Sequence, residues 1–117
     1  MTPNTPLRAT SLMLLLGMGL TLTACTEKDK RLAFDGHFYR AKSAKVDKDN
    51  LLPFVVTVQK ATQSIEGARQ AGAHEGHFYC IKNFGTSRIK WDIGPDSPDA
   101  ALVFDKDALI LRGECNP

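Results

Sequence analysis

The chain has 117 residues and a formal net charge of +2, with 43% apolar and 24% charged residues, which is an ordinary composition for a globular protein. A length of this order accommodates one domain and not two. A charge so close to neutral does not provide the basic stripe that nucleic-acid binding requires, because that binding depends on releasing counterions from phosphates. We therefore expect one small domain and no nucleic-acid partner.

The first 24 residues have the layout of an export signal. Met1–Thr10 is polar and contains Arg8, whereas Ser11–Thr23 is apolar and carries no charge. About a dozen apolar residues span roughly 18 Å as a helix, which is too short for a bilayer core of about 30 Å. This pattern predicts a secretory signal peptide over residues 1–24 and not a transmembrane anchor.

The end of this segment, Leu22-Thr23-Ala24-Cys25, resembles the lipobox of bacterial lipoproteins. The resemblance implies that Cys25 receives a diacylglyceryl group, that cleavage precedes it, and that membrane lipid becomes the anchor. Two or three acyl chains anchor a protein firmly, at about 0.8 kcal/mol per buried methylene group. The alternative is an ordinary signal peptide cut after Ala24, which would leave Cys25 as an exported free thiol.

Residues 25–33 are expected to form the lipidated N-terminus and a short charged tether, and residues 34–117 the domain. Removing the signal leaves about 90 residues, enough for one modest core. Thr26 stands where an aspartate would resemble an inner-membrane retention signal, so we expect the outer membrane, on its periplasmic side. A tether this short reaches about 15 Å, which keeps the domain close to the membrane surface.

Two further cysteines, Cys80 and Cys115, form an even set in a compartment where disulfides persist. They allow a single intramolecular pairing, and closing a loop of about 35 residues would stabilise the domain by roughly 3–4 kcal/mol. The alternative is a reactive thiol at Cys80, with His77 one helical turn away. We expect the disulfide, because it accounts for both cysteines together.

The first half of the domain predicts two strands joined by a turn. Gly36–Val46 is expected to be a strand that alternates between two faces, and Lys45–Asn50 a turn rich in Asp and Asn. Pro53–Lys60 is expected to be a second strand, because β-branched residues dominate it. On the first strand, one face should hold His37, Tyr39 and Ala41 and the other Arg40 and Lys42.

A helix is expected from Ile65 towards Phe84, capped by Thr62 or Ser64 and ended by Gly85 in the left-handed conformation. Glycine costs about 1 kcal/mol relative to alanine within a helix, which leaves a break near Gly72–Gly76 open. Small residues would in return let the helix lie close to a sheet. The apolar stripe contains Ile65, Ala68, Gly72 and Tyr79 and is bordered by Ala71, Phe78 and Ile81.

Three more strands are expected after the helix, over Ser87–Ile93, Ala101–Phe104 and Ala108–Arg112, with a turn at Gly94–Pro98. The predicted class is α+β: a small antiparallel sheet of about five strands in the order β-β-α-β-β-β, with one helix packed on a face and one disulfide. The charged side of the third strand, Arg88, Lys90 and Asp92, is interpreted as a solvated face.

Two segments share an acid-Gly-His-Phe-Tyr-x-x-Lys pattern, Asp35–Lys42 and Glu75–Lys82. One interpretation is a duplicated recognition element that presents the pairs His37/Tyr39 and His77/Tyr79. We favour coincidence, because one copy is predicted on a strand and the other on a helix, where equal spacing directs side chains differently.

Histidine is the only candidate metal ligand with suggestive spacing. His74 and His77 are three residues apart, but the segment lacks the HExxH pattern, and a third ligand would have to be His37. We expect solvated or hydrogen-bonded histidines and no cofactor. Four aspartates near the last turns lack the spacing of a calcium loop and are typical turn residues: Asp96, Asp99, Asp105 and Asp107.

The region from Phe34 to Cys115 resembles small uncharacterised lipoproteins of proteobacterial envelopes, most visibly in NFGTSRIKWD (83–92) and LILRGEC (109–115). The resemblance implies an envelope address and no particular activity. We expect a membrane-anchored, non-catalytic module that binds an envelope protein partner. The alternatives are a histidine-based metal-binding protein or small hydrolase, and an inhibitor of an envelope enzyme.

Overall fold

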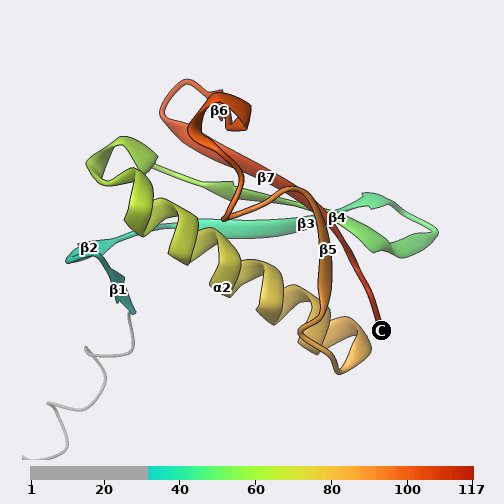
Figure 1. The fold of residues 1–117 in the computed structure, drawn as a ribbon. Helices are drawn as coiled ribbons and strands as arrows, with labels where there is room; N and C mark the ends of the chain where they lie inside the picture. Colours follow the sequence, from blue (N-terminus) through green and yellow to red (C-terminus); the bar gives the residue numbers. More distant parts are fainter. Residues whose placement is uncertain (1–31) are drawn as a thin grey trace, which may run out of the picture. The chain divides into compact units, whose positions relative to one another are not determined.

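One long helix, α2 (Ile65–Phe84), packs across one face of an antiparallel sheet in the computed structural model, which describes residues 32–117 (Figure 1). The predicted α+β class, with one helix on a five-stranded sheet, is confirmed. The main path of the sheet runs β3 (Ala41–Asp47), β4 (Asn50–Val58), β7 (Ala108–Cys115) and β5 (Ile89–Ile93), and β6 (Val103–Asp105) also pairs with β7.

Short elements that the sequence did not predict complete the domain. The strands β1 (Ala33–Phe34) and β2 (His37–Phe38) form a separate hairpin, so Ala33 of the expected tether is part of a strand. Asp35 and Gly36 form its turn with positive φ angles. Two 3-10 helices, η1 (Ala61–Gln63) and η2 (Asp99–Ala101), precede α2 and β6.

The strand boundaries differ from the predicted ones around the first turn. The expected first strand is interrupted at Tyr39 and Arg40, and its earlier part pairs with β1 instead of the main sheet. The turn is tighter than Lys45–Asn50, because Asp47 Oδ1 accepts the Asp49 amide at 3.0 Å. β4 therefore begins at Asn50. At the other end of the chain, β7 continues past the predicted Arg112 to Cys115.

The helix begins and ends where the sequence predicts. Ser64 Oγ accepts a hydrogen bond from the Gly67 amide at 3.0 Å, and Gly85 (φ 72°) donates its amide to the Ile81 carbonyl at 2.8 Å. The helix runs without a break through Gly72 and Gly76. Its glycines therefore serve packing and do not interrupt it.

These glycines set the distance between the helix and the structure beneath it. A methyl group at Gly72 would lie 2.5 Å from Leu111 Cδ1, and one at Gly76 would lie 2.6 Å from Trp91 Cη2. A methyl group at Gly67 would lie 2.6 Å from the Phe34 carbonyl oxygen. All three separations are well below carbon contact distances, so larger residues would push the helix away from the sheet and from the β1–β2 hairpin.

The core between α2 and the sheet follows from strand alternation. Val56 of β4 pairs with Leu111 of β7, and Val58 pairs with Leu109, so four fully buried side chains face the helix. Phe54 extends this layer, with its ring stacked on Tyr79 at 4.8 Å between centroids and edge-on to Trp91 at 5.6 Å.

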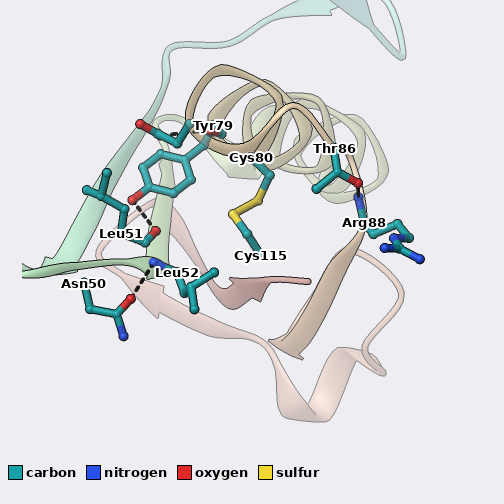
Figure 2. Close-up of a disulfide and its surroundings, with 9 residues drawn as sticks. Asn50, Leu51, Leu52, Tyr79, Cys80, Thr86, Arg88 and Cys115 are labelled. Carbon is teal, nitrogen blue, oxygen red and sulfur yellow. Dashed lines mark hydrogen bonds between the residues drawn. A yellow bond between two sulfur atoms is a disulfide. The ribbon is translucent and has the colours of Figure 1, made fainter. Parts of the chain in front are cut away.

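The predicted disulfide is present. Cys80 of α2 and Cys115 of β7 are bonded, with their Cα atoms 5.6 Å apart, and both residues are buried. Figure 2 shows the bond between the helix and the last strand. Because it joins residues 35 positions apart, it fixes the end of the chain against the helix.

Replacing Gly76 with alanine tests the close packing. Alanine favours a helix by about 1 kcal/mol, but its methyl group would collide with a rigid indole ring, and overpacking typically costs about 1–3 kcal/mol. We expect a net loss of about 1 kcal/mol in the free energy of unfolding, measured by urea denaturation. His77→Ala, on the exposed side of the same helix, should change stability by less than about 0.5 kcal/mol. A Gly76→Ala protein more stable than the wild type would contradict this account.

Candidate functional site

The structure disperses the candidate histidines. His37 lies on β2 with its ring 6.4 Å from that of Tyr39, whereas His74 lies on α2 with its ring 5.8 Å from that of Phe34. His77 is exposed on the same helix. Among residues 32–117, no three His, Cys, Asp or Glu side chains are grouped closely enough to hold a metal ion.

The two copies of the shared sequence pattern adopt different structures, as predicted. Asp35–Lys42 forms the hairpin turn, β2 and the start of β3, whereas Glu75–Lys82 is helical. In each copy the tyrosine hydroxyl donates to a distant backbone carbonyl at 2.8 Å, Tyr39 to Ser64 and Tyr79 to Leu51. Both tyrosines therefore hold the fold together, and they do not form a repeated surface.

A half-buried arginine that no sequence motif marks ties the β5–η2 loop to the helix. Arg69 of α2 donates to the carbonyl oxygens of Pro95, at 2.8 Å, and Ser97, at 2.5 Å. It also forms an ion pair with Asp99. Asp99, one of the four aspartates near the last turns, therefore helps to hold Arg69 in place. The local spacing of these aspartates does not indicate this role. Cys25 lies outside the described residues, so its lipidation stays a prediction.

A groove separates the edge strand β3 from the outer side of α2. Its volume is about 430 Å³. Both walls come from regular elements, the strands β3 and β4 on one side and α2 on the other. Its lining residues are Ala41, Lys42, Ser43, Ala44 and Lys45 of β3, Leu51 of β4, and Glu75, Phe78, Tyr79, Lys82 and Asn83 of α2.

Hydrogen bonds fix the walls of this groove. Ser43 Oγ donates to Glu75 Oε1 at 3.2 Å and thus joins β3 directly to the helix. The Tyr79 hydroxyl reaches the Leu51 carbonyl oxygen on β4, as Figure 2 shows. Asn83 Nδ2 donates to the Tyr79 carbonyl oxygen at 2.9 Å. Most uncharged polar groups of the groove are therefore already used within the domain.

The charge of the groove is positive. Lys42, Lys45 and Lys82 line it and are exposed, whereas Glu75, its one lining carboxylate, accepts a hydrogen bond from Ser43. Within residues 32–117 the ion pair between Arg69 and Asp99 is the only one, so none of these lysines is within 4.0 Å of a carboxylate. By strand alternation Lys45 lies on the same side of β3 as Ser43, which contacts α2, whereas the Lys42 side chain lies on the opposite face of the strand. An anionic group entering the groove would therefore meet Lys45 and Lys82, with Lys42 on the other face of its edge strand.

The groove also contains exposed apolar surface. Phe78 is 56% exposed, and Ile81, on the same outer side of α2, is 52% exposed. Both border the apolar stripe predicted from helical periodicity, and the structure turns them outward. The reason is that the side of α2 that faces the sheet is set by Gly72 and Gly76, with Tyr79 packed inward on Phe54, which leaves Phe78 and Ile81 on the other side.

A second hollow, of about 360 Å³, lies over the ends of β4, β5 and β7. Lys90, Glu114 and Pro53 are cross-strand neighbours that line it, together with Asp92 and Arg112. Because positive and negative side chains alternate there, this hollow has no net preference for an ion of either sign. The groove between β3 and α2, whose lining charges are mostly of one sign, is therefore the candidate site.

Comparison with known proteins finds no family model, no curated protein and no solved structure that matches the chain. Within the described part of the chain, no helix is both long and apolar enough to cross a membrane.

The phenol of Tyr79 predicts a specific alkaline instability. Burial raises its pKa above the ordinary value of 10.0, because the charged form loses hydration. The folded state therefore holds this proton more tightly than the unfolded state does. The resulting stability is fully present below about pH 10 and is lost as the pH rises through the folded-state pKa.

We expect Tyr79→Phe to lose about 1 kcal/mol at neutral pH, because the hydrogen bond to Leu51 disappears. Above about pH 10 its free energy of unfolding should fall less steeply than that of the wild type. Urea denaturation across this pH range measures both effects. Parallel pH profiles for the two proteins would show that Tyr79 does not cause the alkaline loss.

Proposed function

We propose that this protein is a lipid-anchored lipoprotein of the bacterial envelope whose domain binds a protein partner, without catalysis, through the groove between β3 and α2. The observation that carries the proposal is the pairing of exposed phenyl surface with three lysines that line the same hollow and form no ion pair within residues 32–117. Apolar contact area with a charged rim is the composition that recognition surfaces use.

The use of the polar groups in the groove favours binding over chemistry. The Ser43 and Tyr79 hydroxyls and the Asn83 amide each donate to a partner within the domain. A nucleophile needs an adjacent base that is free to take its proton, and the partner of Ser43 is a carboxylate that also holds β3 to the helix. The groups left for a ligand are ammonium groups and apolar carbons, which bind without reacting.

The lipobox supports the anchor. With Cys25 acylated and the domain beginning within a few residues of it, the groove would be held close to the membrane surface, where envelope proteins are its available partners. Anchoring also raises the local concentration of such partners, so a modest affinity would suffice.

Intact mass spectrometry of the protein purified from bacterial membranes tests the anchor. We expect an acylated chain that begins at Cys25, with Cys80 and Cys115 alkylated only after reduction. An unacylated chain would refute the anchor, and alkylation without reductant would contradict the disulfide.

Site-specific photo-crosslinking in the producing bacterium tests the groove. A photoreactive phenylalanine analogue at Phe78 should yield a discrete protein adduct. The matched control is the same analogue at Phe104, which is 40% exposed on β6, a strand on the other side of β7 from β4 and β3. No adduct from Phe78, or the same adducts from both positions, would count against the groove as the binding site.

A further inference from the structure

We propose that the groove binds an extended, acidic segment of a partner protein, which pairs with the free edge of β3 as an additional strand. This inference rests on the proposed function and specifies how the groove would bind. It follows from three features of β3: its position in the sheet, the direction of its backbone groups, and the charge beside it.

The position of β3 leaves one of its edges unpaired. β3 is the first strand of the sheet, and β4 is its one partner among the described strands. α2 packs against the same sheet face and contacts β3 (Figure 1). The groove lies between these two elements. An unpaired strand edge next to a helix is the arrangement that accepts peptides by strand addition.

The register shows which backbone groups point outward. The Gln59 amide donates to the Arg40 carbonyl oxygen at 2.9 Å, and Ala41 is opposite Val58. Hydrogen-bonded and non-hydrogen-bonded pairs alternate along an antiparallel ladder, so Lys42 and Ala44 also direct their backbone groups to β4. The N–H and C=O groups of Ala41, Ser43 and Lys45 therefore point away from the sheet and are available to an incoming strand.

The side chains on this stretch leave room in the groove. Ser43 contacts Glu75 on the helix, and Ala41 packs against the core, so these two small residues lie on the α2 side of β3, whereas Lys42 and Ala44 lie on its opposite face. A strand paired with β3 would direct every second side chain into the space between β3 and α2. There it would meet Phe78, which is 56% exposed.

Charge selects the occupant. Lys45 and Lys82 on the α2 side, and Lys42 on the opposite face of β3, favour glutamate or aspartate side chains on either face of the added segment. Edge-to-edge pairing of two copies of this chain would instead bring the lysines of the two β3 strands together, which is unfavourable. The irregular register between Lys45 and Asp47 limits the pairing stretch to Ala41–Lys45.

A peptide-binding experiment on the full chain, purified in detergent, tests this inference. The probe is a short fluorescent peptide of alternating valine and glutamate. One control peptide replaces glutamate with lysine, and the other carries an N-methyl group on every backbone amide. We expect the acidic peptide to bind and both controls to fail, because the first has the wrong charge and the second cannot donate ladder hydrogen bonds.

Protein variants locate the binding site. A triple variant that combines Lys42→Glu, Lys45→Glu and Lys82→Glu should weaken binding of the acidic peptide about tenfold or more. The control Lys90→Glu changes an exposed strand position outside the groove and should not weaken that binding. Circular dichroism verifies that both proteins fold. On peptide binding, the Ala41, Ser43 and Lys45 amides should gain protection from hydrogen exchange.

Three results would overturn the inference: binding of the N-methylated peptide, undiminished binding by the triple variant, or no binding of the acidic peptide. A soluble headgroup, glycerol phosphate, distinguishes lipid phosphate from an acidic peptide as the source of the anionic group, because it contains no acyl chains into which the anchor could insert. If glycerol phosphate binds the wild type but not the triple variant, while the peptide does not bind, the lysines recognise an anionic headgroup and strand addition is refuted. If the crosslinker at Phe78 yields a protein adduct but the acidic peptide does not bind, the groove is still a protein-binding site, and only binding by strand addition is refuted.

Discussion

The short distance between α2 and the sheet is the constraint on which the rest of this domain depends. Gly72 lies over Leu111 and Gly76 over Trp91, at separations that exclude even a methyl group. The helix therefore presents its glycine side to the sheet, with Tyr79 packed inward on Phe54, and Phe78 and Ile81 are left exposed. The same close approach brings Cys80 to Cys115, so the disulfide covalently secures the position that the glycines allow.

Trp91 shows how far this packing extends. Its ring meets the helix at Gly76, and a methyl group placed at Gly113 of β7 would lie 2.8 Å from its Cε3 atom. Phe54 meets the same indole edge-on, and Tyr79 stacks on Phe54. The aromatic layer thus links three strands to the helix and continues to the tyrosine that lines the groove. The stacking of Tyr79 on Phe54 therefore also fixes the position of a side chain that lines the groove.

Elements with local signals were predictable from the sequence. The serine cap and terminal glycine marked both ends of α2, the even cysteine count indicated the disulfide, and alternation marked β4 and β5. The β1–β2 hairpin was not predictable, because two-residue strands have no measurable period. The outward direction of Phe78 was missed for a different reason. Helical periodicity predicts the buried side of a helix from the hydrophobicity of its residues. In α2 the positions of Gly72 and Gly76 decide which side can approach the sheet.

The groove itself lies beyond local prediction. Its walls meet because β3 is an edge strand and α2 covers β3 and β4, and the order of strands in a sheet is a property of the whole chain. No motif in the sequence links Lys42, Lys45 and Lys82. These lysines line one groove only because the topology places β3 beside α2. Arg69, which holds the β5–η2 loop through two carbonyl oxygens, is a further case in which tertiary contact assigns the role.

A single hydrogen-exchange measurement tests the central claim that the edge of β3 beside the groove is free to pair with another strand. In the unliganded full chain, the Lys42 and Ala44 amides, which bond to β4, should exchange slowly, whereas the Ala41, Ser43 and Lys45 amides should exchange much faster. Alternating slow and fast exchange along β3 is the predicted result. Uniformly slow exchange would show that the edge is already covered and would contradict the account.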